Sequence, residues 1–408
     1  MKILYGHCLS DPNHPAARMV HSIAEELRKP GDDVQVHEPE VAPRKTEQKA
    51  TGIAASTGKR FQRLRNFLWF AKTIRHDRRA LEADIAAIKA FRPDVVLARH
   101  DAYRGSLVRA ARACGVPVVV YADAPVAHET RHWSDDSLAA SKRFHPPGLV
   151  EYYEKRHLAM SSAIVAVSEP GKRCLEAYGL DVPITVIRNG VDEAFLGELP
   201  GPDRKRQMRL QYGIDTPFLA GFVGTFKPFH GTALLAELMK RTADWTDLRW
   251  ILVGDGPRKS ELLRSLGESA SQVTDLGRQP GHRLPELYRL MDFAVAPYPP
   301  SEQPFHFCPL KILEAEASGA VVLASARGDI PALLGQGACG VVVPDDSVET
   351  WAASLRSLMN DPERLRKLSL EAREMIENHY TWNNSARNLR IILERAAESG
   401  VTNRGKSR

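Results

Sequence analysis

The sequence predicts an α/β protein made of two doubly wound, parallel-sheet domains that face each other across a cleft. The chain has 408 residues, too many for a single core of typical size. Short apolar runs alternate with helical patterns along most of the chain, and this alternation is typical of doubly wound sheets. A stretch rich in proline, glycine and charge, Leu196–Gln211, interrupts the alternation near the middle. The interruption indicates two domains.

In the first half, the short apolar runs are expected to be buried parallel strands. They are Ile3–Tyr5, Val34–His37, Val95–Ala98, Val116–Tyr121, Ile164–Val167 and Ile184–Ile187. Helical patterns separate them, and the pattern Ser106–Cys114 is followed by Gly115, which suits the glycine that closes many helices. We assign residues 1–195 to this first domain.

A second series of apolar runs follows the interruption. Its members are Phe218–Val223, Trp250–Val253, Val273–Leu276, Phe293–Ala296, Val321–Ala324 and Gly340–Val343. We place the linker near Leu196–Arg209 and assign residues 210–379 to the second domain. A charged helical pattern, Glu363–Ala397, follows near the end of the chain.

Composition favours a globular protein of a reducing compartment. Hydrophobic residues make up 43% and charged residues 26% of the chain, as in ordinary globular proteins. The apolar run at the N-terminus is too short for a signal peptide, and no run is long enough to cross a bilayer. The five cysteines form no C-x-x-C pair, so neither a disulfide framework nor a zinc site is expected. We expect a cytoplasmic protein.

Positive charge is concentrated in one segment, Lys59–Arg79. The segment contains eight basic residues and one acid, Asp77, so its net charge is +7. The net charge of the whole chain is +6, which leaves about −1 for the remaining residues. A local patch predicts a local anionic partner and argues against general nucleic-acid binding. Interspersed aromatic residues leave two interpretations open. One is peripheral contact with an anionic acceptor or the inner face of a membrane, and the other is a solvated helix packed on the first domain.

The first chemical motif is the run Phe305–Gly319. Pro309 suits the first turn of a helix and Gly319 suits the residue after its end. Backbone N–H groups at the start of such a helix can bind a diphosphate, and we assign this role to the segment Phe307, Cys308, Pro309 and Leu310, in which Pro309 itself has no N–H to donate. Glu314 could accept hydrogen bonds from a ribose diol, while Glu316 lies about 200° further round the helix. A capped helix with solvated acids is the alternative interpretation.

Two further motifs follow strands of the second domain. Phe222–Gly231 runs from a strand into a glycine-containing loop and predicts a donor site formed by Gly224, Thr225, Lys227 and His230. Cations there could neutralise a leaving pyrophosphate, although a lone lysine in a loop is more often simply solvated. Gly254, Asp255, Gly256 and Pro257 suit a phosphate loop or any strand-to-helix turn, and Arg278 follows the next strand, where a nucleobase could bind.

Together, and in this order, these segments resemble the retaining glycosyltransferases of family 4, which have the GT-B fold. The resemblance covers nearly the whole chain. It is carried by Val165–Glu169 (V-x-V-S), Ile187–Asp192 (I-x-N-G-V-D), Gly254–Pro257 (G-D-G-P), Pro309–Gly319 (L-K-x-x-E-A-x-A-x-G) and Tyr380–Trp382 (Y-x-W). It implies an N-terminal acceptor domain completed by a C-terminal helix over residues 380–398, and a C-terminal domain that binds a nucleotide-sugar.

The chain departs from the family pattern at several site positions. Glu314 matches the second of the family's two glutamates, whereas His306 stands at the first position. The family's arginine and lysine fall on Thr225 and His230, with Lys227 nearby.

After the strand that ends at Tyr121, the chain has Asp123 where relatives often carry a catalytic histidine. We expect Asp123 to contact the transferred sugar or the acceptor, and we count Lys227 and His306 with it as catalytic candidates. His100 follows a neighbouring strand, and a catalytic and a structural role for it stay equally open.

The chain contains no D-x-D triplet, so the metal site of the other main glycosyltransferase architecture is absent. We expect no metal and no cofactor beyond the donor. Lys227, His230, Lys311 and helix N-termini are expected to balance the charge of the leaving diphosphate. The resemblance implies retention of configuration by same-face attack without a covalent enzyme intermediate.

Two other functions remain open: a degenerate subunit that binds without turnover, and a nucleotide-sugar 2-epimerase. We expect loops such as Val41–Gly58 to select the hydroxyl acceptor. That acceptor could be a polysaccharide, a glycolipid or a small metabolite.

Overall fold

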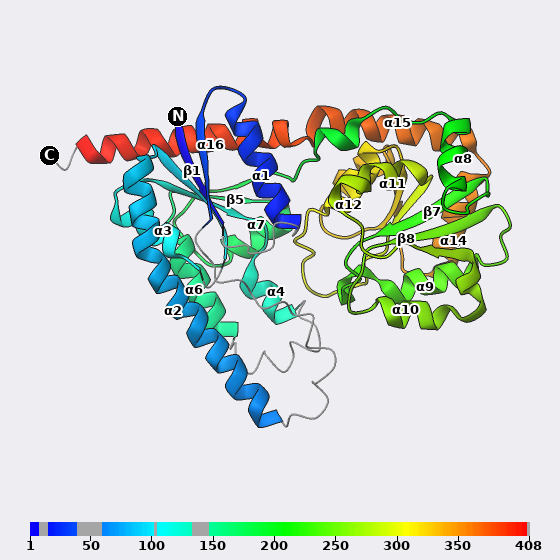
Figure 1. Ribbon diagram of the computed structural model, residues 1–408, viewed down its shortest axis with the longest axis horizontal. Helices are drawn as coiled ribbons and strands as arrows, with labels where there is room; N and C mark the ends of the chain where they lie inside the picture. Colours follow the sequence, from blue (N-terminus) through cyan, green and yellow to red (C-terminus); the bar gives the residue numbers. More distant parts are fainter. Residues whose placement is uncertain (8–14, 39–58, 102–103, 133–146, 406–408) are drawn as a thin grey trace. The chain divides into compact units, whose positions relative to one another are not determined.

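The computed structural model describes residues 1–7, 15–38, 59–101, 104–132 and 147–405 (Figure 1). The chain divides into two compact units. Unit 1 comprises Met1–Arg188 and Ser385–Arg408, and unit 2 comprises Asn189–Asn384. The predicted acceptor loop Val41–Gly58 lies outside the described residues.

Unit 1 is built on a six-stranded parallel sheet with the order β2-β1-β3-β4-β5-β6. Its strands are β1 (Lys2–Gly6), β2 (Asp33–His37), β3 (Val95–Arg99), β4 (Val118–Ala122), β5 (Ala163–Ala166) and β6 (Ile184–Val186). Its helices are α1 (Pro15–Arg28), α2 (Lys59–Phe91), α3 (Ser106–Ala113), α4 (Val126–His132), α6 (Pro147–Leu158), α7 (Glu169–Glu176) and most of α16 (Trp382–Gly405).

Local chemistry explains several of these elements. Every residue of β4 is buried, as expected for a central parallel strand covered on both faces. Helix α7 begins after Ser168, whose Oγ accepts a hydrogen bond from the Gly171 N–H at 3.0 Å. The basic segment lies in α2, and there Asp77 accepts hydrogen bonds from the Ser106 N–H at 2.8 Å and the Arg109 Nη2 at 2.5 Å. This part of α2 therefore packs against α3.

Unit 2 contains a second six-stranded parallel sheet with the order β12-β11-β10-β7-β8-β9. Its strands are β7 (Phe218–Val223), β8 (Leu248–Val253), β9 (Val273–Asp275), β10 (Phe293–Ala296), β11 (Val321–Ser325) and β12 (Val341–Val343). Its helices are α8 (Pro202–Leu210), α9 (Thr232–Arg241), α10 (Lys259–Leu266), α11 (Leu284–Leu290), α12 (Leu310–Ala317), α13 (Ile330–Leu333), α14 (Val348–Met359) and α15 (Pro362–His379), with a short 3₁₀ turn, η3 (Pro228–His230), after β7. Trp250, Phe293 and Trp351 are fully buried in its core.

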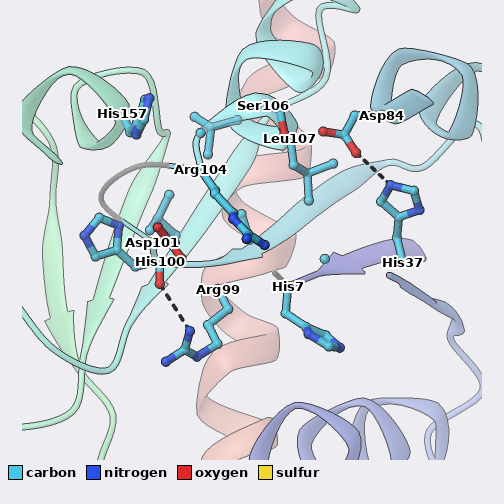
Figure 2. A pocket seen from close by; sticks show the side chains of 15 residues that line it. His7, His37, Asp84, Arg99, His100, Asp101, Arg104, Ser106, Leu107 and His157 are labelled. Atoms are coloured by element: carbon cyan, nitrogen blue, oxygen red, sulfur yellow. Dashed lines mark hydrogen bonds and ion pairs between the residues drawn. The ribbon is translucent and has the colours of Figure 1, made fainter. Parts of the chain in front are cut away.

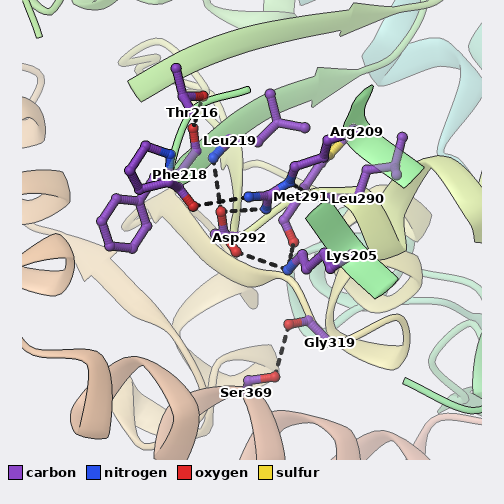
Figure 3. Close-up of polar contacts among 11 residues, drawn as sticks. Lys205, Arg209, Thr216, Phe218, Leu219, Leu290, Met291, Asp292, Gly319 and Ser369 are labelled. Atoms are coloured by element: carbon purple, nitrogen blue, oxygen red, sulfur yellow. Dashed lines mark hydrogen bonds and ion pairs between the residues drawn. The ribbon is translucent and has the colours of Figure 1, made fainter. Parts of the chain in front are cut away.

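The predicted linker Leu196–Arg209 was wrong, because the structure places this stretch inside unit 2. Much of it forms α8, and Figure 3 shows how α8 is anchored. Asp292 accepts a hydrogen bond from Arg209 Nη2 at 2.5 Å, and its other oxygen lies 2.8 Å from Lys205 Nζ. The Leu219 N–H of β7 also donates to Asp292 at 2.8 Å. The charges that marked the stretch as a linker thus attach α8 to the sheet.

The predicted fold class, two doubly wound parallel sheets flanked by helices, is confirmed (Figure 1). In each sheet the strand order reverses once, between β1 and β3 in unit 1 and between β7 and β10 in unit 2. Ligands of such sheets bind beyond the carboxyl ends of the strands at this reversal. Among the described residues, no helix has the length and apolarity needed to cross a membrane.

Candidate functional site

The predicted site residues fall in both units. Asp123 and His100 belong to unit 1, whereas Lys227, His306 and all the predicted donor-binding residues belong to unit 2. Each group is described within its own unit.

In unit 2, the predicted glycines hold neighbouring loops together at the carboxyl ends of β7 and β8. The Gly224 N–H donates to Val253 O at 2.9 Å, and the Gly254 N–H donates to Gly277 O at 2.7 Å. A Cβ at Gly254 would lie 1.9 Å from Gly224 O, and one at Gly256 would lie 1.7 Å from Thr225 O. No side chain fits at such distances, so close loop packing explains why these positions are glycine.

The loop after β7 places Lys227 and His230 together. The Lys227 N–H donates to His230 Nδ1 at 3.3 Å, and Lys227 Nζ lies 5.7 Å from the Phe229 ring centroid. Burial, together with the charges of Lys311 and Lys227, lowers the pKa of His230 to about 2. Because Nδ1 accepts a hydrogen bond, Nε2 carries the proton of the neutral ring. The expectation that His230 supplies positive charge was therefore wrong for the unliganded protein, although its Nε2–H remains a donor.

Helix α12 begins one residue later than predicted. Pro309 is its extended N-cap residue and Leu310 its first residue. At the other end Gly319 has φ of +83°, as predicted for the residue that closes the helix. The Cys308 carbonyl accepts a hydrogen bond from Asn189 Nδ2 at 2.9 Å, which links the I-x-N-G-V-D segment to the start of α12.

The two acids of α12 are both buried, so the alternative of solvated acids was wrong. Glu314 Oε2 accepts a hydrogen bond from the Tyr288 hydroxyl at 3.3 Å. The carboxyl oxygens of Glu316 have no hydrogen-bond partner in the described part of the chain, and burial raises its pKa well above the usual value. Glu316 is therefore a neutral acid of the interior, and Glu314 is the acid of this helix with polar contacts.

Lys311 lies beside the point at which the strand order of unit 2 reverses, between β7 and β10. Its Nζ lies 4.3 Å from the ring centroid of Phe222 in β7 and 5.7 Å from that of Tyr298, which follows β10. A Cβ at Gly224 would lie only 2.8 Å from this Nζ. The Nζ is buried and has no hydrogen-bond partner among the described residues. Burial lowers its pKa to about 7, and Glu314 acts in the opposite direction.

An ammonium group can donate three hydrogen bonds, and leaving them unmade in the interior is costly. Lys311 is thus a preorganised cation whose Nζ makes no hydrogen bond within the described residues, at the edge of the sheet where ligands bind. The sequence-based prediction named it as a positive charge together with Lys227 and His230, and in the structure the Nζ of Lys311 is buried whereas Lys227 is exposed.

Tyr298, one of the two rings beside Lys311 Nζ, belongs to a larger aromatic cluster that the sequence-based prediction did not include, although it named Phe307 and His306 individually. Phe307 stacks on Phe229, with ring centroids 5.0 Å apart and an interplanar angle of 15°. His306 is fully buried, and its ring centroid lies 4.1 Å from that of Phe307. The ring centroids of Tyr298 and Phe305 lie 4.6 Å apart. The F-x-F pattern at Phe305 and Phe307 is the signal from which this cluster could have been predicted.

Three predicted donor residues are more peripheral. Thr225, Lys227 and Arg278 are exposed, and Arg278 follows β9 at the sheet edge. Sequence reasoning missed Lys259, which is buried, donates to Gly254 O at 2.7 Å and pairs with Asp275 at 2.6 Å. Lys259 thereby fixes the turn after β8.

In unit 1, Asp123 follows β4 and pairs with Arg99 at the end of β3. Arg99 Nη2 lies 2.6 Å from Asp123 Oδ2. Burial opposes the charge of Arg99, but Asp123 and Asp101 outweigh it and raise the pKa of the guanidinium. The Asp123 carboxylate is therefore fixed by Arg99, and its side chain is still 20% exposed to solvent.

His100 is engaged in a buried network. Its Nε2 lies 2.8 Å from Glu154 Oε1, and Glu154 also accepts hydrogen bonds from the Val126 and Ala127 N–H groups, each at 2.8 Å. These contacts place the Glu154 carboxylate at the N-terminus of α4, where the helix dipole favours negative charge. Of the two roles left open for His100, the geometry favours the structural one.

A small pocket lies beside these residues, and Figure 2 shows His7, Arg99, Asp101, Arg104 and His157 around it. Its volume is about 20 Å³, enough for a single water.

Two family models match the chain. The model described as Glycosyltransferase Family 4 matches residues 16–195, and the model described as Glycosyl transferases group 1 matches residues 217–361. A D-inositol 3-phosphate glycosyltransferase of Rhodococcus erythropolis is 30% identical over 62% of this chain and 58% of its own length. An alpha-maltose-1-phosphate synthase of Mycolicibacterium smegmatis is 26% identical over 74% of this chain and 79% of its own length. This chain matches 50–58% of the length of three inositol 3-phosphate glycosyltransferases.

Solved structures of similar fold include those of two further proteins. Sucrose-phosphate synthase of Thermosynechococcus elongatus has a TM-score of 0.74 and 17% identity, with 98% of this chain and 99% of that chain covered. HepE of Anabaena, solved in complex with UDP, has a TM-score of 0.66 and 17% identity, with 97% and 100% covered. At this identity the likeness shows the fold, and the fold is that of GT-B proteins.

Proposed function

We propose, from the premise that this chain belongs to the family 4 and group 1 glycosyltransferases, that it transfers a sugar from a nucleotide-sugar to a hydroxyl acceptor. The relatives named above are glycosyltransferases or sugar-phosphate synthases, and HepE has been solved with UDP and with UDP-glucose. We further propose that unit 2 binds the donor. In this proposal the anomeric configuration is retained, and no metal acts on the leaving group.

The observation that carries the proposal is the buried Nζ of Lys311, which has no hydrogen-bond partner in the part of the chain that the structure describes. It lies beside Phe222 of β7 and Tyr298, which follows β10, and Lys311 belongs to the first turn of α12. A diphosphate bound there would accept hydrogen bonds from Lys311 and from the backbone at the start of the helix. Lys227, in the loop after β7, adds an exposed positive charge.

These donors can replace a metal at the leaving group. A fixed ammonium and helix N–H groups stabilise negative charge as it develops on the departing diphosphate. The acceptor oxygen attacks the anomeric carbon while the bond from that carbon to the phosphate oxygen breaks. If attack comes from the face of the leaving group, the departing phosphate can accept the hydroxyl proton, and the enzyme needs no nucleophile. Asp123, held by Arg99, is proposed to orient the sugar or the acceptor, and Glu314 to bind the ribose diol.

A binding subunit without turnover is the competing function. The observation that favours it is His306, a buried imidazole where the family pattern has its first glutamate. Release of free sugar from the donor in the absence of acceptor distinguishes the two. An enzyme hydrolyses its donor slowly, whereas a binding subunit leaves it intact.

The test is a thermal-shift panel of UDP-, GDP-, ADP- and dTDP-sugars on the wild type and on Glu314→Ala. A donor at a hundred times its dissociation constant should stabilise the wild type by about 2.7 kcal/mol. A shift with one nucleotide that is reduced in Glu314→Ala supports the donor site. No shift with any nucleotide would overturn the proposed function.

A further inference from the structure

Three side chains that can bind metals converge in unit 1, which contains none of the residues assigned to the donor. His7 follows β1, His21 lies in α1 and Glu38 follows β2. The Nε2 atoms of both histidines approach the same carboxylate oxygen, Glu38 Oε1, at 3.1 Å from His7 and 3.5 Å from His21. One ligand atom from each of the three residues lies within 4.8 Å of the others.

These separations match those between atoms that share a cation. Ligands about 2.1 Å from a tetrahedral or octahedral metal are roughly 3.0–3.4 Å apart. The two imidazole rings are nearly perpendicular, at 80°, with centroids 6.1 Å apart, so they approach the carboxylate from different directions. A hydrogen bond between one histidine and the carboxylate does not explain why the second histidine also lies at this distance from it.

The sheet holds the central ligand in place. The His7 side chain is only 1% exposed, and its backbone N–H donates to His37 O at 3.4 Å. Gly6 pairs with His37 in the β1–β2 register, so residues 7 and 38 follow paired strand ends. His21 and Glu38 are about half exposed, at 52% and 55%, which leaves solvent access for further ligands. A buried ligand on a rigid strand end with an open outer face is the arrangement of a preorganised metal site.

We propose that His7, His21 and Glu38 bind one divalent first-row transition ion, of the Zn²⁺ or Co²⁺ type, with the remaining positions open to water. Two imidazoles among three ligands favour such ions over Mg²⁺ and Ca²⁺, which prefer oxygen. The inference goes beyond the proposed function and does not depend on it, because no donor-binding residue takes part. The cation would tie β1, α1 and β2 together within unit 1.

The test uses tag-free full-length protein that has been treated with EDTA and desalted. Zn²⁺ binding is measured by calorimetry and Co²⁺ binding by visible absorption. The wild type is expected to bind one equivalent, and His21→Ala and Glu38→Gln should each weaken binding at least about tenfold. His379→Ala, an exposed histidine outside the cluster, is the matched control and should bind like the wild type.

Circular dichroism and the metal-free melting temperature show whether the variants fold. His21 and Glu38 are half exposed, so both variants should fold normally. The proposal is overturned if the wild type binds no metal, or if His21→Ala and Glu38→Gln bind as tightly as the wild type. Nucleotide binding measured in EDTA stays an independent test of the donor site.

Discussion

Lys311 Nζ lies 4.3 Å from the ring centroid of Phe222 and, within the described residues, donates no hydrogen bond. An ammonium above an aromatic ring is partly stabilised by the π-electrons. That contact does not replace the hydrogen bonds that water would have provided. The protein therefore keeps a cation in an unfavourable position at the edge of its sheet, and a bound anion would relieve this cost.

The first prediction concerns stability without ligand. The pKa of Lys311 is about 7 in the folded protein, against a usual value of 10.5, so the unfolded chain binds more protons between these values. Lys311 therefore destabilises the fold fully below pH 7, and this penalty disappears as pH rises toward 10.5. Lys311→Met should be at least as stable as the wild type at pH 6.5. Urea unfolding at pH 6.5 and 9.5 should show the advantage of Lys311→Met shrinking at the higher pH.

The second prediction concerns the attachment of α8. Asp292→Ala removes the partner of buried Arg209 and leaves its charge uncompensated. We expect a loss of about 3 kcal/mol in the free energy of unfolding. The control is Asp215→Ala, which breaks the exposed pair with Arg206 and should cost at most about 1 kcal/mol. Equal losses in the two variants would show that α8 is not anchored through Asp292.

A third prediction follows from the loop packing beside the donor site. Gly256→Ala would place a Cβ 1.7 Å from Thr225 O and must push the two loops apart. We expect destabilisation of about 1–3 kcal/mol and weaker nucleotide binding. Gly201→Ala, where no atom lies within 4 Å of the new Cβ and φ is −63°, is the control and should leave both properties unchanged. Wild-type behaviour of Gly256→Ala would contradict this packing.

The fourth prediction separates structure from catalysis at His100. His100→Ala removes the buried partner of Glu154, so we expect a loss of about 2–3 kcal/mol in stability. Because the network lies in unit 1, nucleotide affinity at 15 °C should not change. The melting temperature and calorimetric nucleotide titration provide the two measurements. A stable variant with abolished transfer would instead assign His100 to the reacting atoms.

Much of the fold could be predicted from the sequence because the strands are short apolar runs buried on both faces. Val118–Ala122 and Phe293–Ala296 are examples, and their positions match the predicted strands closely. The linker could not be predicted in this way. Arg209 looks like a surface charge in sequence, and only the contact with Asp292, far along the chain, shows that it is buried.

The candidate site likewise has features that could be predicted from the sequence and features that could not. The glycines and the α12 motif could be placed because turns and helix ends have local signatures. Charge state could not be predicted, because burial sets it. His230 looks cationic in sequence but is neutral in the fold, while Lys311 gains importance because its Nζ has no hydrogen-bond partner among the residues that the structure describes. The cluster of His7, His21 and Glu38 has no recognisable spacing, since three separate elements bring it together.

The most direct test of the central claim is a calorimetric titration of the nucleoside diphosphate selected by the panel, beginning with UDP. Wild type, Lys311→Met and the exposed control Lys367→Met are compared in EDTA at pH 6.5 and 8.5. If Lys311 holds the diphosphate, Lys311→Met should bind about 10–100-fold more weakly, which corresponds to losing charged hydrogen bonds. Wild-type affinity should also fall toward pH 8.5 as Lys311 loses its proton, and this change should be absent in Lys311→Met. Equal affinities of Lys311→Met and the wild type at both pH values would contradict the account.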